Sequence, residues 1–118
     1  MDSVQARVID YDSANLTEKE LLNIQDGSHF KETKTVTWIN INGLHDIDIL
    51  REVGRIFQLH PLVMEDILNT GQRPKVEEFD AYVYSVLKMI RFDTETHKII
   101  NEQLSIITGQ NYVITFQE

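Results

Sequence analysis

The stretch that decides the fold is residues 81–117, AYVYSVLKMIRFDTETHKIINEQLSIITGQNYVITFQ. Three segments in it, residues 81–92, 99–108 and 112–117, are rich in β-branched and aromatic side chains, which favour strands. Short polar stretches, DTETH and GQN, separate the segments and are typical of turns. The pattern predicts three consecutive antiparallel strands, a meander at the C-terminal end of the chain.

Two amphipathic helices are predicted upstream of this meander. Residues 46–58 carry Ile, Leu, Val and Phe at helical spacing. Pro61 suits the first turn of the next helix, where its missing N–H is not needed, and Gly71 is placed to end that helix. Gly54 weakens the first helix by up to ~1 kcal/mol unless close packing requires a glycine there.

The pattern in the N-terminal third of the chain predicts two strands with one more helix between them. Residues 4–8 and 35–41 alternate between apolar and polar side chains, as strands do. Between them, Thr17 followed by Glu20 forms a capping-box pattern, which predicts a helix that ends near residues 24–27. The fold class predicted from this order of elements is α/β: a mixed β-sheet with helices packed on its faces, ending in the three-strand antiparallel meander.

Length and composition predict one soluble domain over residues 1–118. The chain is 42% hydrophobic and 25% charged, which is ordinary for a globular domain. Its net charge of -8 provides no basic surface for phosphates, so we expect no nucleic-acid partner and favour metal cations or basic partners. The absence of cysteine excludes disulfides, cysteine zinc sites and thiol nucleophiles. Neither a signal peptide nor an apolar run of the ~20 residues needed to cross a bilayer is present.

The sequence carries no recognisable catalytic motif, so we do not expect an enzyme. A phosphate-binding glycine loop, a nucleophile elbow and a paired-histidine zinc helix are all missing. His29, His45, His60 and His97 show no metal-ligand spacing, so each is expected to be a cap, a turn residue or a surface residue. No loop has the alternating Asp and Asn of an EF-hand.

Candidate metal ligands occur in residues 60–69, HPLVMEDILN. On a helix that turns 100° per residue, Glu65, Asp66 and Asn69 share one face, opposite the apolar side chains. Mg²⁺ prefers oxygen ligands and often uses only one or two carboxylates, which Glu65 and Asp66 would supply. One short helix offers too few ligands for a complete site, so a second surface would have to contribute. The alternative is that both are ordinary negative charges in the early turns of a helix.

The string HPLVMEDILNTGQRPKVEEFDAYVYSVLKM, residues 60–89, resembles the cytoplasmic domain of the CorA family of magnesium and cobalt transporters. Its elements His-Pro-Leu, Glu-Asp, Gln-Arg-Pro-Lys and Val-Leu-Lys-Met occur in order with family-like spacing. The upstream TVTWINING and the terminal NYVITFQE also match that family. The resemblance extends from about residue 36 to residue 118, whereas residues 1–35 match only in general layout.

This resemblance implies a homopentamer in which the domain forms part of a funnel on the cytoplasmic face of the cell membrane. The stalk helix and the two transmembrane helices would lie beyond residue 118, because the family's Gly-Met-Asn pore motif is absent here. In the family, carboxylates at the positions of Glu65 and Asp66 help to bind regulatory Mg²⁺ near a subunit boundary, with acidic partners from the neighbouring subunit. Co²⁺ is a second candidate ion.

The mechanism implied by the resemblance is feedback by cytosolic Mg²⁺, which bridges subunits and favours the closed pore. Two other interpretations stay open at this point. One is the cytoplasmic domain of a related zinc transporter of the same superfamily. The other is a free-standing interaction module whose acidic face binds a basic partner.

Overall fold

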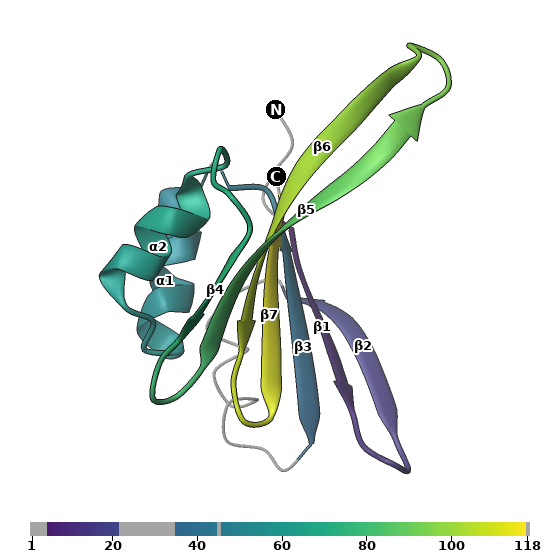
Figure 1. The fold of residues 1–118 in the computed structure, drawn as a ribbon. Coiled ribbons are helices and arrows are strands. Elements are labelled where there is room, and N and C mark those ends of the chain that lie inside the picture. The colour runs from purple at the N-terminus through teal and green to yellow at the C-terminus, as the bar shows by residue number, and fades with distance from the viewer. Residues whose placement is uncertain (1–4, 22–34, 45, 118) are drawn as a thin grey trace.

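The computed structural model describes residues 5–21, 35–44 and 46–117. In these ranges the chain forms seven strands and two helices: β1 Gln5–Tyr11, β2 Leu16–Leu21, β3 Val36–Asn42, α1 Ile47–Ile56, α2 Pro61–Leu68, β4 Lys75–Glu78, β5 Val83–Asp93, β6 Lys98–Thr108 and β7 Tyr112–Gln117. The strands form one sheet in the order β2-β1-β3-β7-β6-β5-β4. Figure 1 shows both helices on the same side of that sheet.

The sheet consists of two antiparallel halves joined by a parallel pair of strands. β2, β1 and β3 form one half, and β7, β6, β5 and β4 form the other. Between the halves, β3 and β7 pair in parallel, with Ile39 opposite Ile114 and Ile41 opposite Phe116. The sheet is therefore mixed, as the sequence predicted.

The prediction of a helix that begins at Thr17 is wrong, because Leu16–Leu21 forms strand β2. This strand pairs with β1, and the turn between them is closed by the Asp12 side chain, which accepts hydrogen bonds from the N–H groups of Ala14 and Asn15, each at 2.8 Å. The same side-chain bonding can also begin a helix, so the ladder of β2 with β1, from Ala6 opposite Leu21 to Tyr11 opposite Leu16, is what holds residues 16–21 extended. The end of the predicted helix, near residues 24–27, lies outside the described residues.

Helix α1 agrees with the helix predicted for residues 46–58. Asp46 caps it by accepting hydrogen bonds from the N–H groups of Asp48 and Ile49. Gly54 is buried at its contact with α2, where an added Cβ would lie 3.1 Å from Cγ of Met64. Close packing between the two helices therefore explains the glycine.

Helix α2 begins at Pro61, as predicted, but ends earlier than expected. His60 precedes it, and its Nδ1 accepts a hydrogen bond from the N–H of Leu62 at 3.1 Å. The helix ends at Leu68 and is capped by Asn69 in an extended conformation, so Gly71 does not end it. In a longer helix the carbonyl of Asp66 would accept from the N–H of Thr70, whereas here it accepts from the N–H of Asn69 and from the side-chain amide of Gln72.

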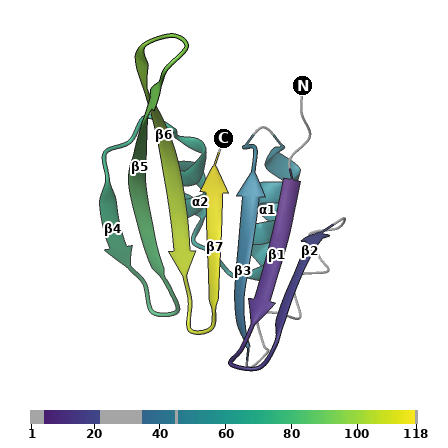
Figure 2. The same cartoon turned by 90° about the vertical axis from the view of Figure 1, so that its right-hand side faces the viewer.

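The core lies between the two helices and one face of the sheet. Its fully buried members come from both layers: Val8, Ile39, Ile41, Tyr84, Val86, Ile107, Ile114 and Phe116 from strands, and Leu50, Val53, Val63 and Ile67 from helices. The sequence predicted helices on the faces of the sheet, but both described helices cover the same face, behind the strands in Figure 2. Burying each such side chain stabilises the fold by roughly 1.5–3 kcal/mol, so helix docking is a major source of stability.

The outer half of the β5–β6 hairpin extends beyond the rest of the sheet as a two-stranded arm. β5 and β6 pair from Val83 opposite Thr108 out to Asp93 opposite Lys98, whereas β4 pairs with β5 no further than Val86. The arm rises clear of the other strands in Figure 1. From Leu87 opposite Leu104 outward, no third described strand pairs with the hairpin.

Replacing Gly109 by alanine should destabilise the fold. An added Cβ would lie 2.2 Å from ring atoms of Tyr112, whose ring is buried and packs 4.9 Å from that of Phe57. Because the ring has little room to move, we expect a loss of about 1–3 kcal/mol in the free energy of unfolding, measured by urea denaturation.

The matched control is Gly71→Ala, where the added Cβ would meet only the side-chain oxygen of Asn69, at an ordinary 3.8 Å. This control should stay within about 0.5 kcal/mol of the wild type. Equal stability of the two variants would contradict the packing argument for Gly109.

Candidate metal-binding site

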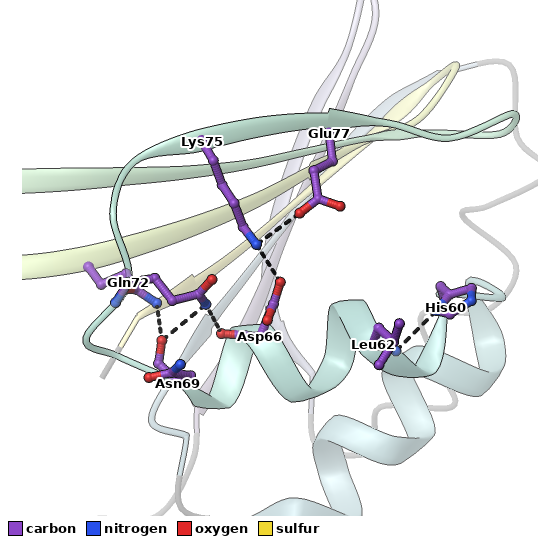
Figure 3. Close-up of polar contacts among 8 residues, drawn as sticks. His60, Leu62, Asp66, Asn69, Gln72, Lys75 and Glu77 are labelled. Atoms are coloured by element: carbon purple, nitrogen blue, oxygen red, sulfur yellow. Dashed lines mark hydrogen bonds and ion pairs between the residues drawn. The ribbon is translucent and has the colours of Figure 1, made fainter.

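The two candidate metal ligands are adjacent on α2 but have different neighbours. Asp66 points toward the edge strand β4, and 34% of its side chain is exposed (Figure 3). Glu65 is exposed and lines a groove between α1 and α2. The helical spacing predicted both carboxylates on one solvent-facing side and did not predict this difference.

The Asp66 carboxylate already holds a cationic group. Nζ of Lys75 lies 2.6 Å from Oδ2 of Asp66 and 2.8 Å from Oε1 of Glu77. Lys75 and Glu77 are two residues apart on β4, so their side chains leave the strand on the same face, toward α2. Hydrogen bonding to Asp66, and then to Glu77, raises the pKa of Lys75 above its ordinary value. The lysine therefore stays charged at physiological pH.

A buried tyrosine lies beneath this ion cluster. Nζ of Lys75 is 5.6 Å from the ring centre of Tyr84, which is fully buried. The Tyr84 hydroxyl has no partner at hydrogen-bonding geometry among the described residues, although Gln72 and Ser105 lie close enough to oppose the rise in its pKa. Burial is the larger effect and raises the pKa of Tyr84. The phenol stays neutral and offers a ring face to the lysine.

Two glutamine side chains attach the end of α2 to the sheet. Gln103 of β6 is only 5% exposed; its Nε2 donates to the carbonyl of Asn69 at 2.9 Å, and its Oε1 accepts from the N–H of Gln72 at 3.2 Å. The side chain of Gln72 donates to the carbonyls of Asp66 and Asn69 (Figure 3). These bonds fix Asp66 relative to the strands. Gln72 and Gln103 were not identified from the sequence, because they lie far apart along the chain.

The third predicted polar group, the side chain of Asn69, has a local role. Its Oδ1 accepts a hydrogen bond from the N–H of Gly71 at 3.3 Å, which closes the turn after α2. Asn69 is therefore engaged in the turn and not directed at the carboxylates as the helical geometry suggested.

The groove on the other side of α2 combines apolar walls with charges of both signs. It has a volume of about 510 Å³ and is lined by Leu50 and Met64 among other apolar side chains. Arg51 and Arg55 of α1 and Glu65 of α2 also line it. Arg55 pairs with Glu52 one turn earlier on the same helix.

The donor set fits one part of a hard-cation site but does not complete one. Carboxylate oxygens are the ligands that Mg²⁺ prefers, and the Asp66 carboxylate is at present paired with the ammonium group of Lys75. Among the described residues, no three His, Asp or Glu side chains are grouped so that they could hold a metal ion. Glu65 and Asp66 would hold the ion only with ligands or water from outside this chain.

The two histidines that the structure describes have local structural roles. His60 is the N-cap of α2, and His97 has a positive φ of 54° in the turn of the β5–β6 hairpin. These positions agree with the predicted cap and turn roles. His29 and His45 lie outside the described residues. Across the described ranges, no helix has the length and apolar character needed to span a membrane.

The fold defines the class of the chain: an α/β domain with one mixed seven-stranded sheet and two helices on one face of it. It is similar to the soluble domain of CorA from Methanocaldococcus jannaschii, with a TM-score of 0.63 and 16% identity over 92% of this chain and 39% of that one. It is also similar to the full-length CmaX protein, with a TM-score of 0.68 and 9% identity over 96% of this chain and 34% of that one. At these identities the likeness is one of fold.

The chain belongs to the family described as CorA-like Mg²⁺ transporter protein, whose profile matches residues 33–118. It is 42% identical over 117 residues to the cobalt/magnesium transport protein CorA of Thermotoga maritima, covering 99% of this chain and 33% of that protein. It is 31% identical over 81 residues to the putative metal ion transporter YfjQ of Bacillus subtilis, covering 67% of this chain and 23% of that protein.

The similarity to the Thermotoga protein includes the N-terminal third, where the resemblance of the sequence to the family was one of general layout only. The chain spans about a third of that relative's length.

Replacing Gln103 by methionine should destabilise the attachment of α2. The change keeps the size of the side chain but removes its three hydrogen bonds, to Asn69, Gln72 and Lys88. The N–H of Gln72 would lose this partner and the carbonyl of Asn69 would keep only the side chain of Gln72, so we expect a loss of about 1–3 kcal/mol in the free energy of unfolding, measured by urea denaturation. Gln110→Met, at an exposed turn position, is the control and should be nearly neutral. An unchanged free energy of unfolding in Gln103→Met would show that water replaces the lost hydrogen bonds.

Proposed function

We propose that this chain is the cytoplasmic, Mg²⁺-sensing regulatory domain of a CorA-like magnesium and cobalt transporter. The observation that carries the proposal is that Asp66, on the helix whose sequence resembles the family's regulatory site, has about a third of its side chain exposed and contacts a cationic group. Family membership and the cobalt/magnesium name of the Thermotoga relative support Mg²⁺ and Co²⁺ over Zn²⁺ as the ions concerned. The proposed role is regulatory and not enzymatic.

The sensor would operate between subunits of a homo-oligomer, a pentamer in the family. Glu65 and Asp66 supply two carboxylates, so a neighbouring subunit has to provide the remaining ligands. Each copy of the chain carries a formal charge of -8, so adjacent copies repel each other. A bound Mg²⁺ offsets this repulsion where acidic groups face one another.

Gating follows if the closed arrangement binds Mg²⁺ more tightly than the open one. At high cytosolic Mg²⁺ the ion bridges subunits and favours closure; at low Mg²⁺ the bridge is lost and the assembly loosens. Only the difference in affinity between the two states shifts the equilibrium. Membrane attachment would come from the part of the protein beyond residue 118.

The isolated chain should bind Mg²⁺ only weakly. Two adjacent carboxylates, one of them held by Lys75, are too few for tight binding, so we expect a Kd on the order of 1 mM or weaker. Isothermal titration calorimetry, on a sample whose monomeric state is verified by light scattering, measures it. Micromolar affinity that disappears in Asp66→Ala would mean that the site is self-contained.

In the full-length transporter, the double variant Glu65→Gln/Asp66→Asn should respond less to cytosolic Mg²⁺. Each amide keeps the shape of the side chain and removes its charge. We expect the Mg²⁺ midpoint for protection against proteolysis and for transport inhibition to rise about tenfold, which corresponds to ~1.4 kcal/mol of lost differential binding. Stability should fall by no more than about 1 kcal/mol, since the pair between Asp66 and Lys75 is partly exposed.

The control for this experiment is Glu78→Gln/Asp80→Asn, which removes the same charge from two exposed positions at β4 and the turn after it. Its Mg²⁺ midpoint should match the wild type within about twofold, because general surface charge acts weakly through salt. An unchanged Mg²⁺ midpoint in the Glu65→Gln/Asp66→Asn variant would mean that these two residues are ordinary surface charges.

A further inference from the structure

Lys75 occupies the position between two carboxylates that belong to different elements. Its ammonium group lies 2.6 Å from an oxygen of Asp66 on α2 and 2.8 Å from an oxygen of Glu77 on β4. The three side chains are between 33% and 44% exposed, so ions from solvent reach them. Figure 3 shows the lysine extending from its strand directly to the helix.

We propose that Lys75 is a built-in competitor for the divalent cation: its ammonium group holds Asp66 in the metal-free state, and the metal has to displace it. Lys75 thereby sets the affinity of the sensor. This inference rests on the proposed function, since it assumes that Asp66 is a ligand of the regulatory ion. It assigns to Lys75 and Glu77 a role in that regulation.

The charges explain why a divalent ion can win this competition. One ammonium between two carboxylates leaves a net charge of -1 in the cluster, whereas a divalent ion in its place would neutralise both. The neighbouring Glu65 adds further negative charge beside Asp66. A monovalent ion has no such advantage, because it would replace one positive charge with another that is not tethered to the chain. The arrangement therefore favours divalent over monovalent cations.

The lysine is the partner that can move. Asp66 is on a helix whose end is fastened by the buried Gln103, so the backbone that carries its short side chain has a fixed position. Lys75 has a flexible four-carbon stem on an edge strand, and its ammonium group is a compact charge that water solvates well. When a metal ion takes the place between Asp66 and Glu77, the ammonium can turn to solvent. Displacement does not require the backbone to move.

A purely structural role makes a different prediction. Charged side chains that point inward from an edge strand protect it against pairing with other chains, and Lys75 also ties β4 to α2. If that were its whole role, removing its charge would change stability and aggregation but would leave the affinity for metal unchanged. The two roles are separated by measuring both quantities on the same variants.

The test compares Lys75→Met with Lys98→Met in the chain of residues 1–118. Methionine keeps the apolar stem and removes the charge, and Lys98 lies at the exposed tip of the β5–β6 arm. Mn²⁺ is the probe, because it broadens the NMR signals of nearby backbone amides even when it binds weakly. Titrating the broadening at Glu65, Asp66 and Glu77 gives an apparent Kd for this position, and excess Mg²⁺ should reverse it. Urea denaturation is recorded in parallel.

We expect Lys75→Met to bind Mn²⁺ about fivefold to tenfold more tightly than the wild type, the range that loss of two partly exposed ion pairs would release. Lys98→Met should stay within about twofold of the wild type, because it removes the same charge far from the cluster. Adding Asp66→Asn to Lys75→Met should abolish the gain. This set of results would support the competitor role whatever the change in stability.

Two other outcomes overturn the inference, and they are distinguishable. If Asp66→Asn alone weakens Mn²⁺ binding but Lys75→Met leaves the Kd unchanged, Lys75 is not a competitor and the proposed sensor survives. If neither Asp66→Asn nor Glu65→Gln affects the broadening, no metal binds there. In that case the proposed function and this inference fail together.

Discussion

The parallel pairing of β3 with β7 is the constraint on which the rest of the structure depends. It joins two antiparallel halves that would otherwise be separate small sheets. Facing the helices, Ile39 and Ile114 are fully buried across this pair. On the opposite face, Trp38 donates a hydrogen bond from Nε1 to Oγ1 of Thr115 at 2.9 Å. Apolar burial on one side and a polar link on the other fix these central strands.

This pairing also decides where the metal-ligand candidates lie. Because β3 and β7 are neighbours and run in the same direction, the chain between them has to leave the sheet and cross over, and in this structure it returns at the far edge as β4. α1 and α2 form the first part of that connection and β4 to β6 form the rest. The connection therefore brings α2 alongside the edge strand β4, and Asp66 meets Lys75 there. A surface carboxylate becomes one member of an ion cluster as a consequence of topology.

Local sequence signals were reliable where a segment's partners are close along the chain. Asp46 and Pro61 mark the starts of α1 and α2 as their side-chain chemistry predicts. The capping-box pattern at Thr17 failed, because pairing with β1 and the turn built on Asp12 stabilise a strand in the same residues. A helix start is a small local preference, and a ladder of hydrogen bonds to a neighbouring strand outweighs it.

The sequence by itself determined the family, the mixed sheet, the positions of α1 and α2, and Glu65 and Asp66 as candidate ligands. These follow from periodicity, caps and motif order, which are properties of neighbouring residues. Only the tertiary structure decided that both helices share one face, that Gln103 fastens the end of α2, and that Lys75 holds Asp66. Gln103 lies 34 residues from Asn69, and contacts over such separations depend on how the sheet is assembled. No local pattern encodes them.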